Sequence, residues 1–563
     1  MTSNKADSDF KRCFSFDTLD ELVKACVHFY HESLEKTMCD HTLEQRANLS
    51  KWIRKFHCDC ETLTLLVEDA IERLKMGPCL FLMTAHQPNL FAYSGVFRKA
   101  ILNNVLANRL SKILKLPVVS FFGIADQDFT NDRWVKSALL PDVERRDGIL
   151  ELRADLPEKM MTCKVNKPSE QVLANWRSQI EDWLSKKLSS IERSSNFLDH
   201  KLCLSDLKVK ENFELFWDIV KEAYAKSDVY SDFNAFVMSR IVNIMWGTDT
   251  LFARFSECQQ IFEREFCAIL ARYDEYSKYV QEATTTEKCA EGISEREHEI
   301  FPFWYHCDCG SKARLSVERH DNSLVGKGEC LACEKEYQVS FCPPNNLKIP
   351  GGIDRISARS LSMPLVFFDG LKVCCYIGGV GGSDYLRQAQ YVARNMGLTF
   401  GPVAVWRPRD IYLGLSQFEA STTFQSISGT FDFSRCLQIE ECLKEKVADV
   451  QRDIEDIELQ KRDLVKSKED REKVIQKLKV LSAKQVEIRN KSNFSVLMRK
   501  LRLIENVKTV MHMYPSIIDF AVNVGLKETG EQWTKFLEND GNLLSDLSLH
   551  ADFDRFVSIV KSQ

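Results

Sequence analysis

The pattern that most constrains the fold is a strand, a polar loop, a helix and a second strand, all within about 50 residues. The first apolar run covers residues 79–83, follows a Gly-Pro pair and ends in the polar loop 84–90. Apolar residues at helical spacing extend from about residue 96 to 114, and residues 117–124 form a second apolar run. Continuous apolar runs indicate strands buried on both faces, and strands joined by a helix are parallel with a right-handed crossover. The chain is therefore predicted to contain a βαβ unit.

A second α/β segment lies far along the chain. Residues 365–368, 373–377 and 403–406 are predicted strands, and a helix is predicted near 383–396, directly after a glycine-rich loop. Between the two segments the pattern is mostly helical and charged, although residues 149–152 are a strand candidate and residues 237–246 fit either element. Two βαβ patterns separated in this way indicate one parallel sheet assembled from two halves. We therefore predict an α/β fold with a split, Rossmann-like core.

The chain has 563 residues, more than one hydrophobic core normally serves, so several structural units are expected. We predict a helical N-terminal segment (1–76), the first half of a nucleotide-binding-like core (77–150), a helical insertion (151–300), a zinc-ribbon-like insert (301–344), the second half of the core (345–436), a coiled coil (437–495) and a C-terminal helical segment (496–563).

The predicted coiled coil lies in a region, residues 431–514, that contains neither glycine nor proline. Apolar residues recur there at alternating steps of four and three, as at Leu443, Val447 and Val450. That spacing is typical of a coiled-coil seam. Charged residues interrupt the seam near its centre. The pattern is therefore compatible both with one long helical rod and with an antiparallel hairpin that turns around residues 467–470. We expect self-association through it, with a charged helix packed on the body and a partner-binding arm as alternatives.

Composition and charge disfavour several classes of protein. The net charge of −5 argues against nucleic acid as a partner. We find no run of about 18 apolar residues and no apolar stretch after the N-terminal charges, so neither a membrane span nor a signal peptide is expected, and the predicted location is the cytoplasm. The 20 cysteines are interpreted as reduced thiols together with one metal cluster.

The strongest local motif is a pair of cysteine turns with ribbon-like spacing. Cys307 and Cys309 form the first turn, Cys330 and Cys333 form the second, and 20 residues separate the two turns. Four thiolates complete the tetrahedral shell of zinc and leave no open position, which predicts a structural zinc site. The first turn is Cys-x-Cys instead of Cys-x-x-Cys, so His306 or Cys342 remains an alternative ligand. A second group, His57-Cys58-Asp59-Cys60, has no matching pair and is expected to be structural.

Polar side chains follow the first two predicted strands. Thr84, His86 and Gln87 lie between a strand and a helix, where oriented donors and a helix N-terminus favour phosphate. A turn at Pro88-Asn89 would explain the same residues without a ligand. Asp126 and Asp128 end the next strand, where they either bind Mg²⁺ or an amine or simply cap a helix.

The glycine-rich loop after the strand 373–377 is a further candidate. Gly378, Gly379 and Gly381 lie between that strand and the next predicted helix. Glycines allow the backbone to approach a ligand closely, and the helix dipole favours an anion there. We predict a ligand-binding role for this loop, with a tight turn as the alternative.

These loops together resemble the bacillithiol synthase family. The family's first core loop is matched by Thr84, Gln87, Leu90 and Phe91, its acidic strand end by Asp126, Asp128 and Phe129, and its glycine loop by Gly378, Gly379 and Gly381, followed at the family's spacing by Tyr385 and Gln388. Arg359 resembles the arginine that precedes that loop. The chain departs from the family at Ala85, His86, Ala125, Gln127 and Val380, and the cysteine ribbon is not part of the family's usual pattern.

The resemblance implies a class I aminoacyl-tRNA-synthetase-like core and a homodimer formed by the long helices. It also implies a ligase that joins the carboxyl group of cysteine to an amino-sugar acceptor of the glucosaminyl-malate type, with ATP and Mg²⁺ as expected cofactors. Under this hypothesis Thr84, His86 and Gln87 hold phosphate or stabilise developing charge, Asp126 and Asp128 bind an amine or Mg²⁺, the glycines with Tyr385 and Gln388 hold the nucleotide, and Arg359 pairs with a carboxylate or phosphate.

Two other functions fit the same residues. The chain is alternatively a non-catalytic scaffold that combines a degenerate nucleotide-binding core with a zinc ribbon and a coiled coil. An enzyme that acts on tRNA or on another amino acid is the other alternative, although the acidic balance of the chain argues against tRNA.

Overall fold

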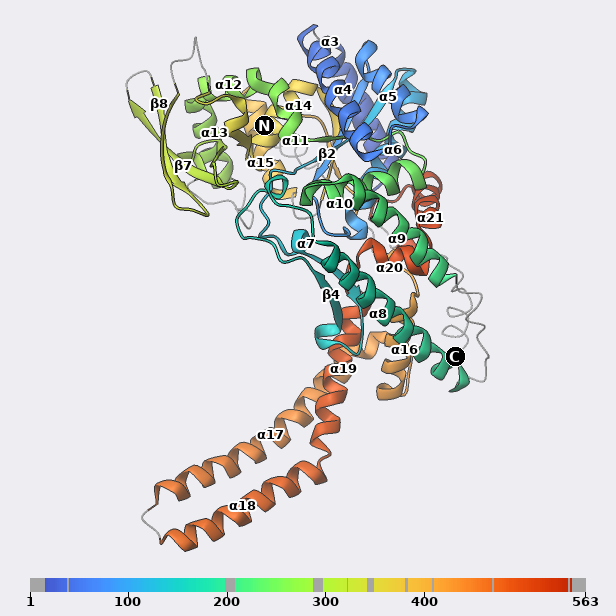
Figure 1. Cartoon of the computed structure of the whole chain (residues 1–563), viewed down its shortest axis with the longest axis vertical. Helices are drawn as coiled ribbons and strands as arrows, with labels where there is room; N and C mark the ends of the chain where they lie inside the picture. The colour runs from blue at the N-terminus through green and yellow to red at the C-terminus, as the bar shows by residue number, and fades with distance from the viewer. Residues whose placement is uncertain are drawn as a thin grey trace, which may run out of the picture.

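The computed structural model describes residues 16–37, 40–197, 208–286, 297–320, 323–341, 349–379, 383–407, 410–467, 470–544 and 547–548. These residues form a mixed α/β body from which a long pair of helices extends (Figure 1). Among the described helices, none is both long enough and apolar enough to cross a membrane.

A five-stranded parallel sheet lies at the centre of the body. Its strands are β1 (Leu80–His86), β2 (Val118–Ile124), β5 (Leu251–Arg254), β11 (Val373–Gly378) and β12 (Val403–Val405), in the order β12-β11-β1-β2-β5. The strands that follow β1 are added on one side of it as β2 and β5, and then on its other side as β11 and β12, so the strand order reverses between β1 and β11. Segments 293 residues apart therefore pair directly, with Thr84 opposite Ile377. Because all strands are parallel, the loops after them lie at one edge of the sheet.

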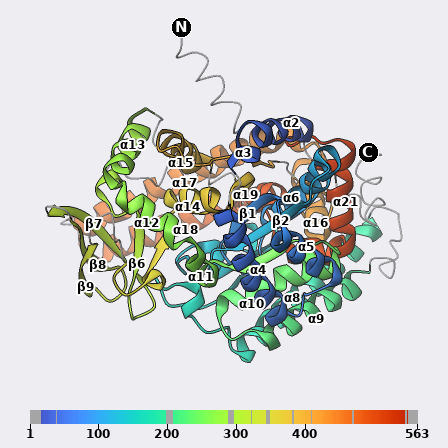
Figure 2. The same ribbon diagram turned by 90° about the horizontal axis from the view of Figure 1, so that it is seen from above.

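Helices cover both faces of the sheet, and successive residues of β1 are buried in two separate cores. On one face, Leu80 and Leu82 of β1 are buried with α2 (Leu19–Phe29) and α6 (Ser94–Leu114). On the other face, Phe81 and Met83 pack in the core formed with α4 (Asp40–Cys60), α5 (Leu65–Met76), α14 (Ser362–Leu371) and α15 (Ser383–Asn395). Figure 2 shows β1 and β2 between α2 and α6 on one side and α4 and α5 on the other.

Four predicted core strands are confirmed, at residues 79–83, 117–124, 373–377 and 403–406. The strand predicted at residues 365–368 is wrong, because these residues belong to helix α14. Nearly every residue of α14 is buried, including Leu365 through Phe368. A helix that is buried all round carries a continuous apolar run, which resembles that of a buried strand.

The region between the two halves of the sheet, predicted to be mostly helical, also contains strands. The edge strand β5 comes from it, and residues 237–245 are helical, in α10 (Tyr230–Ser239) and a following π-helix (Arg240–Met245). The strand expected at 149–152 exists as β4 (Ile149–Arg153). It pairs antiparallel with β3 (Ser137–Pro141) in a separate two-stranded sheet.

The cysteine insert folds as an antiparallel sheet. Its strands are β6 (Phe303–His306), β7 (Lys312–His320), β8 (Ser323–Cys330) and β9 (Glu336–Phe341), and β10 (Ile356–Ala358) adds to the edge beside β6. We call this sheet with its two cysteine turns the ribbon. It extends the predicted insert by one strand from the following segment.

The region of the predicted coiled coil forms a hairpin instead of one rod. Helix α17 (Cys436–Lys466) runs outward and α18 (Arg471–Lys491) returns beside it, as Figure 1 shows. Lys461 Nζ donates to Gln485 Oε1 at 2.6 Å, and Gln485 Nε2 donates to Glu458 Oε1 at 3.2 Å. Helix α19 (Phe494–His512) then packs against the base of α17.

Further helices complete the body. They are α3 (Glu35–Thr37), α7 (Arg133–Lys136), α8 (Glu170–Phe197), α9 (Val209–Lys226), α11 (Phe255–Cys258), α12 (Glu263–Ala271), α13 (Tyr273–Thr286), α16 (Leu415–Ser428), α20 (Ile517–Asn523) and α21 (Leu526–Asn539). Two short strands, β13 (Asp410–Ile411) and β14 (Leu547–Ser548), pair in parallel.

Candidate functional site

One large cavity opens at the edge of the parallel sheet where the strand order reverses. Its volume is about 880 Å³. His86 and Gln87, at the end of β1, line it together with Gly378 and Gly379, at the end of β11. The two loops that the sequence singled out, although far apart in the chain, therefore face one common space. Crevices at such reversal points are the usual ligand sites of open α/β sheets.

The wall of this cavity is rich in cations and aromatic rings. The cations among its described lining residues are Arg98, Lys99, Lys312, Arg359 and Arg407, and the carboxylates are Asp128 and Asp132. The aromatic lining residues include Tyr93, Trp134, Tyr376, Tyr385, Trp406 and Tyr514. Five cations against two carboxylates favour an anionic ligand, and the rings provide flat apolar surface for a base or another ring.

Lys99 is a candidate residue that the motifs in the sequence did not reveal. It lies on the second turn of α6 and is buried, and its Nζ donates to the backbone O of Ala85 at 3.1 Å. A Cβ atom added to Gly379 would lie 3.5 Å from both Cε and Nζ of Lys99. Burial lowers the pKa of Lys99 from 10.5 to about 7. The lysine thus connects the β1 loop with the β11 glycine loop.

His86 is neutral at pH 7. Burial, followed by the nearby Lys99 cation, lowers its pKa from 6.5 to about 3. Its Nδ1 lies 3.0 Å from the backbone O of Gln87, and the ring meets Tyr93 edge-on. Since a carbonyl only accepts hydrogen bonds, Nδ1 carries the proton and Nε2 is left as an acceptor. His86 therefore suits a ligand that donates a hydrogen bond, such as an amine.

Asp128, Lys312 and Tyr385 form another part of the wall. Desolvation by the walls raises the pKa of Asp128 above its usual value, and Lys312 opposes this shift. Burial lowers the pKa of Lys312 to about 8. Burial, and then Asp128, raises the pKa of Tyr385 to about 12, so its hydroxyl stays protonated. A carboxylate with a raised pKa beside the space for a ligand is suited to accept a proton.

Arg359 lies on the cavity wall above an aromatic ring. Its guanidinium carbon is 4.9 Å from the centre of the Trp304 ring, and the Nζ of Lys312 is 5.1 Å from the same ring. The sequence resemblance pointed to Arg359, but Lys312 was missed because it lies in the ribbon, three residues after Cys309.

Several predicted site residues face away from the cavity. Thr84 is fully buried and its Oγ1 donates to the backbone O of Ile377 at 2.8 Å, which ties β1 to β11. Asp126 is buried and accepts hydrogen bonds from the backbone N and the hydroxyl of Ser256, at the start of α11. This contact matches the capping alternative, although in a distant helix. Gln388 is buried on α15 and does not line the cavity, and Gly381 lies outside the described residues.

The four cysteines of the ribbon come together as a metal-binding cluster. All four Sγ atoms lie within 4.8 Å of one another, with Cys307 to Cys333 and Cys309 to Cys330 each at 3.5 Å. A tetrahedral zinc site with Zn–S bonds of about 2.3 Å requires S–S separations of roughly 3.8 Å, so the donor set fits zinc in both chemistry and size.

The alternative ligands receive no support from the described residues. His306 uses Nδ1 in a 2.8 Å hydrogen bond with the backbone O of Asp354, and Cys342 lies outside the described residues. His57 of the second cysteine group is fully buried, with Nδ1 2.7 Å from Thr62 Oγ1 and Nε2 accepting from the backbone N of Phe252. These contacts give His57 a structural role, as expected.

Purified protein should contain one zinc ion per chain, because four thiolates converge without an intervening group. Elemental analysis after extensive dialysis measures this content. Cys330→Ser should lower it to near zero, whereas Cys58→Ser, at an exposed cysteine outside the cluster, should leave it unchanged. Full zinc retention in the Cys330→Ser protein would contradict the assignment.

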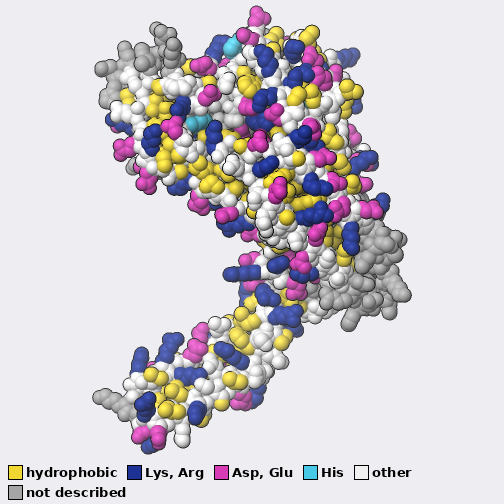
Figure 3. All heavy atoms as spheres, in the orientation of Figure 1, with side chains coloured by type: hydrophobic (Ala, Val, Ile, Leu, Met, Phe, Trp, Pro, Cys, Tyr) yellow, Lys and Arg dark blue, Asp and Glu magenta, His cyan; other side chains and the backbone are white. Residues whose placement is uncertain are grey.

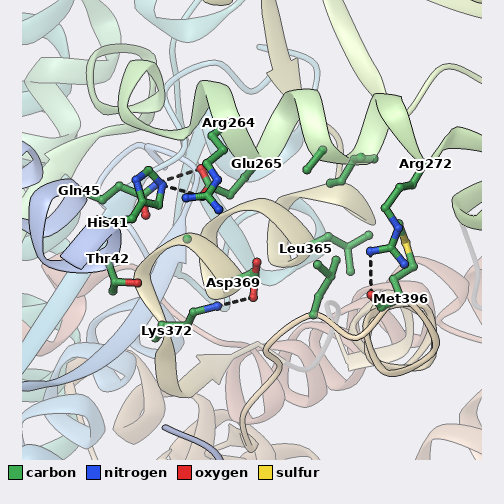
Figure 4. A pocket seen from close by; sticks show the side chains of 14 residues that line it. His41, Thr42, Gln45, Arg264, Glu265, Arg272, Leu365, Asp369, Lys372 and Met396 are labelled. Carbon is green, nitrogen blue, oxygen red and sulfur yellow. Dashed lines mark hydrogen bonds and ion pairs between the residues drawn. The ribbon is translucent and has the colours of Figure 1, made fainter. Parts of the chain in front are cut away.

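A second cavity, of about 170 Å³, lies between α4, α12 and α14 (Figure 4). Its polar groups are largely engaged with one another: Lys372 Nζ pairs with Asp369 at 2.7 Å, and His41 Nε2 is 3.4 Å from Glu265. Because these charges are already satisfied, this small cavity has much less to offer a ligand than the cavity at the edge of the parallel sheet.

A scan of protein-family models and a search of curated proteins found no match to this chain, so the candidate site rests on its own geometry.

Proposed function

We propose that this chain is a ligase of the bacillithiol-synthase type, which joins the carboxyl group of cysteine to the amino group of a glucosaminyl-malate-type sugar. One observation carries this proposal: the β1 loop and the β11 glycine loop line one cation-rich cavity. Cysteine, ATP and a malate-bearing sugar all carry anionic groups, which matches the charge of the wall.

The strand order supports a Rossmann-like interpretation of the core. β1 lies in the middle of the sheet. The strands β2 and β5 follow on one side of it, and β11 and β12 follow on the other side. We propose that this is the split nucleotide-binding core of class I aminoacyl-tRNA synthetases, with the nucleotide in the crevice beside β1 and β11. Gly379 and Lys99 then face the polyphosphate, because a bare backbone and a buried ammonium suit close contact with phosphate oxygens.

In the proposed reaction, a carboxylate oxygen of cysteine attacks a phosphorus atom of ATP. A P–O bond of the polyphosphate breaks, the displaced phosphate group leaves with the electron pair of that bond, and the cysteine carboxyl becomes a phosphate-linked acyl group. The amine of the sugar attacks the acyl carbon, the new C–N bond forms, and the C–O bond to the phosphate breaks. Asp128 accepts the proton that the amine loses, and the phosphate leaves with the electron pair of the broken bond. His86, which is neutral, accepts a hydrogen bond from an amine without repelling it.

The direct test is ATP consumption by purified protein with cysteine and glucosaminyl malate. Turnover should require both substrates, and Gly379→Asp should abolish it. A Cβ at Gly379 meets Lys99 only at ordinary contact distance, so the new carboxylate acts by its charge and not by a clash. Gly77→Asp, at a glycine with nothing within 4 Å, is the matched control and should keep full activity.

No turnover with authentic acceptor would remove the substrate assignment. ATP binding by calorimetry then separates the remaining alternatives. Binding that Gly379→Asp abolishes would leave an enzyme with another substrate, whereas no ATP binding at all would favour the scaffold.

We also propose that the hairpin of α17 and α18 pairs with a second copy of the chain. Val465 and Val480 are each 67% exposed on it, and Figure 3 shows hydrophobic side chains among the charges along this arm. Sedimentation analysis should find a dimer, and Val465→Glu with Val480→Glu should convert it to a monomer. Leu65→Glu, at a 90% exposed leucine on α5, is the control and should stay dimeric. A monomeric unsubstituted protein would contradict this proposal.

A further inference from the structure

Lys312 is a buried lysine whose side chain lies in the wall of the large cavity. Its side chain is 2% exposed. Among the residues that the structure describes, its ammonium has one hydrogen-bond acceptor, the backbone O of Gln127 at 2.8 Å. The group carries three protons, so two remain for a ligand in the cavity that Lys312 lines. Burying a cation that has one hydrogen-bond acceptor costs stability, and such groups are concentrated at functional sites.

Arg359 and Lys312 line the same cavity, and their charged ends lie 4.9 Å and 5.1 Å from the centre of the Trp304 ring. The charge of Arg359 also acts on Lys312 and lowers its pKa. Phe129 flanks the same place, with its ring centre 4.3 Å from the Lys312 Nζ. Two like charges in a poorly hydrated wall repel each other, and an anion that binds both removes this repulsion. The charges of Asp128 and Asp126 both act on Lys312, and among the described residues neither carboxylate forms a direct ion pair with it.

The two cysteine turns hold the backbone of Lys312. The first turn closes with a hydrogen bond from Cys307 N to Ser311 O at 2.9 Å, and Lys312 follows directly as the first residue of β7. The backbone O of Lys312 accepts from the N of Leu331, in the second turn, at 3.0 Å. Lys312 is thus attached to both halves of the metal cluster.

The first turn is also attached to the body of the protein. Met161 N donates to Gly310 O at 3.0 Å, and Ser311 Oγ donates to the backbone O of Lys159. A Cβ at Gly310, whose φ is +90°, would lie 2.7 Å from Met160 Cε, so the turn fits closely against this loop. Thr162 N in turn donates to Asp128 O at 3.0 Å. The contacts run without a break from the cysteines to the cavity wall.

We propose that the ribbon is a working part of the cavity: its metal-held turns fix the Lys312 ammonium beside Arg359, and the two cations together bind an oxyanion of the ligand. The oxyanion is a carboxylate or a phosphate, and the proposed function supplies both, as glucosaminyl malate and as ATP. The inference rests on the proposed function for this choice of ligands. It extends that function because the metal then controls ligand affinity and not only folding of the ribbon.

The test is calorimetric binding of Mg-ATP and of glucosaminyl malate, each alone, to the full-length zinc-loaded protein. Lys312→Met should keep its zinc and weaken binding of one of the two ligands by about 10- to 100-fold, the range for a lost hydrogen bond to a charged group. The ligand that is weakened identifies the source of the oxyanion. Lys327→Met is the matched control, because this lysine is 40% exposed in the same ribbon and pairs with Glu318. It should bind both ligands normally.

Zinc removal by a chelator provides the second arm. The metal-free unsubstituted protein should lose the same affinity as Lys312→Met, and added zinc should restore it. Zinc removal should weaken binding by Lys312→Met no further, since both changes act through one ammonium.

Normal ligand binding by Lys312→Met, or normal binding by the unsubstituted protein without zinc, would overturn the inference. It would also be overturned if zinc removal weakened ligand binding by Lys312→Met as much as it weakens binding by the unsubstituted protein. Absence of binding of either ligand by the unsubstituted protein would have the same consequence. The fate of the proposed function is measured separately. Absence of ligation by a protein that shows the zinc-dependent and Lys312-dependent binding would remove the ligase and leave the inference standing.

Discussion

Replacing Lys99 with methionine should reduce ATP-dependent ligation by about 10²- to 10³-fold, the loss expected when one oriented group that stabilises charge is removed. Lys99 contacts the backbone of Ala85 and approaches Gly379, so it is the cation common to the two loops of the cavity. Methionine has nearly the same length and shape but no charge. Steady-state kinetics with saturating cysteine and acceptor measures the loss.

The same substitution should stabilise the fold, which separates a functional role from a structural one. The pKa of Lys99 is about 7 in the folded protein and 10.5 in the unfolded chain, so folding expels a proton or buries a charge. Below pH 7 both states are charged and the cost is complete. As pH rises from 7 to 10.5 the folded state loses its proton first, and the cost fades. Lys99→Met should therefore raise the melting temperature most below pH 7, and by little near pH 10.

Lys112→Met is the matched control for Lys99→Met, because Lys112 is an exposed lysine near the end of the same helix. It should change neither ligation nor the pH dependence of the melting temperature. A Lys99→Met protein that is destabilised and remains as active per folded molecule as the unsubstituted chain would contradict the functional role.

The core strands that are buried on both faces were predicted correctly from the sequence. The prediction failed for a helix that is buried all round and for a strand that is too short, because neither shows a periodic pattern of apolar residues. β1, β2 and β11 carry continuous apolar runs, which is why their positions were recognised. The buried helix α14 carries the same kind of run and was therefore mistaken for a strand. β5 has four residues, too few to show a period of two, and was missed inside a helical region.

The candidate site was predictable in part for a topological reason. Loops after parallel strands share one edge of the sheet, so the prediction of one parallel sheet built from both halves places the loops at His86 and Gly379 at the same edge. Side-chain direction was not predictable from spacing alone, and Thr84 and Asp126 are used within the protein interior. Lys99 and Lys312 were not predicted as site residues because each lies in the cavity only through contact with a segment that is distant in the sequence. Lys99 approaches Gly379, and Lys312 donates to the backbone O of Gln127.

Replacing Lys187 with methionine should destabilise the protein by about 3–5 kcal/mol, the usual cost of breaking a buried ion pair from one side. Lys187 is 2% exposed on α8, and its Nζ pairs with Asp142 and, at 2.5 Å, with Glu419 of α16. Methionine would leave two buried carboxylates without their common cation. Denaturant unfolding followed by circular dichroism measures the change in the free energy of unfolding.

Asp142, Lys187 and Glu419 come from three of the segments predicted from the sequence, namely 77–150, 151–300 and 345–436. Breaking this buried ion cluster therefore tests whether it holds those segments together. Adding Asp142→Asn and Glu419→Gln to Lys187→Met should recover much of the lost stability, because neutral amides are less costly to bury than carboxylates. The control is Lys186→Met, at the adjacent lysine, which is 61% exposed and pairs with Asp182 on the helix surface. An exposed pair contributes at most about 1 kcal/mol, so Lys186→Met should have little effect. Equal stability of Lys187→Met and Lys186→Met would show that the buried cluster does not hold the segments together.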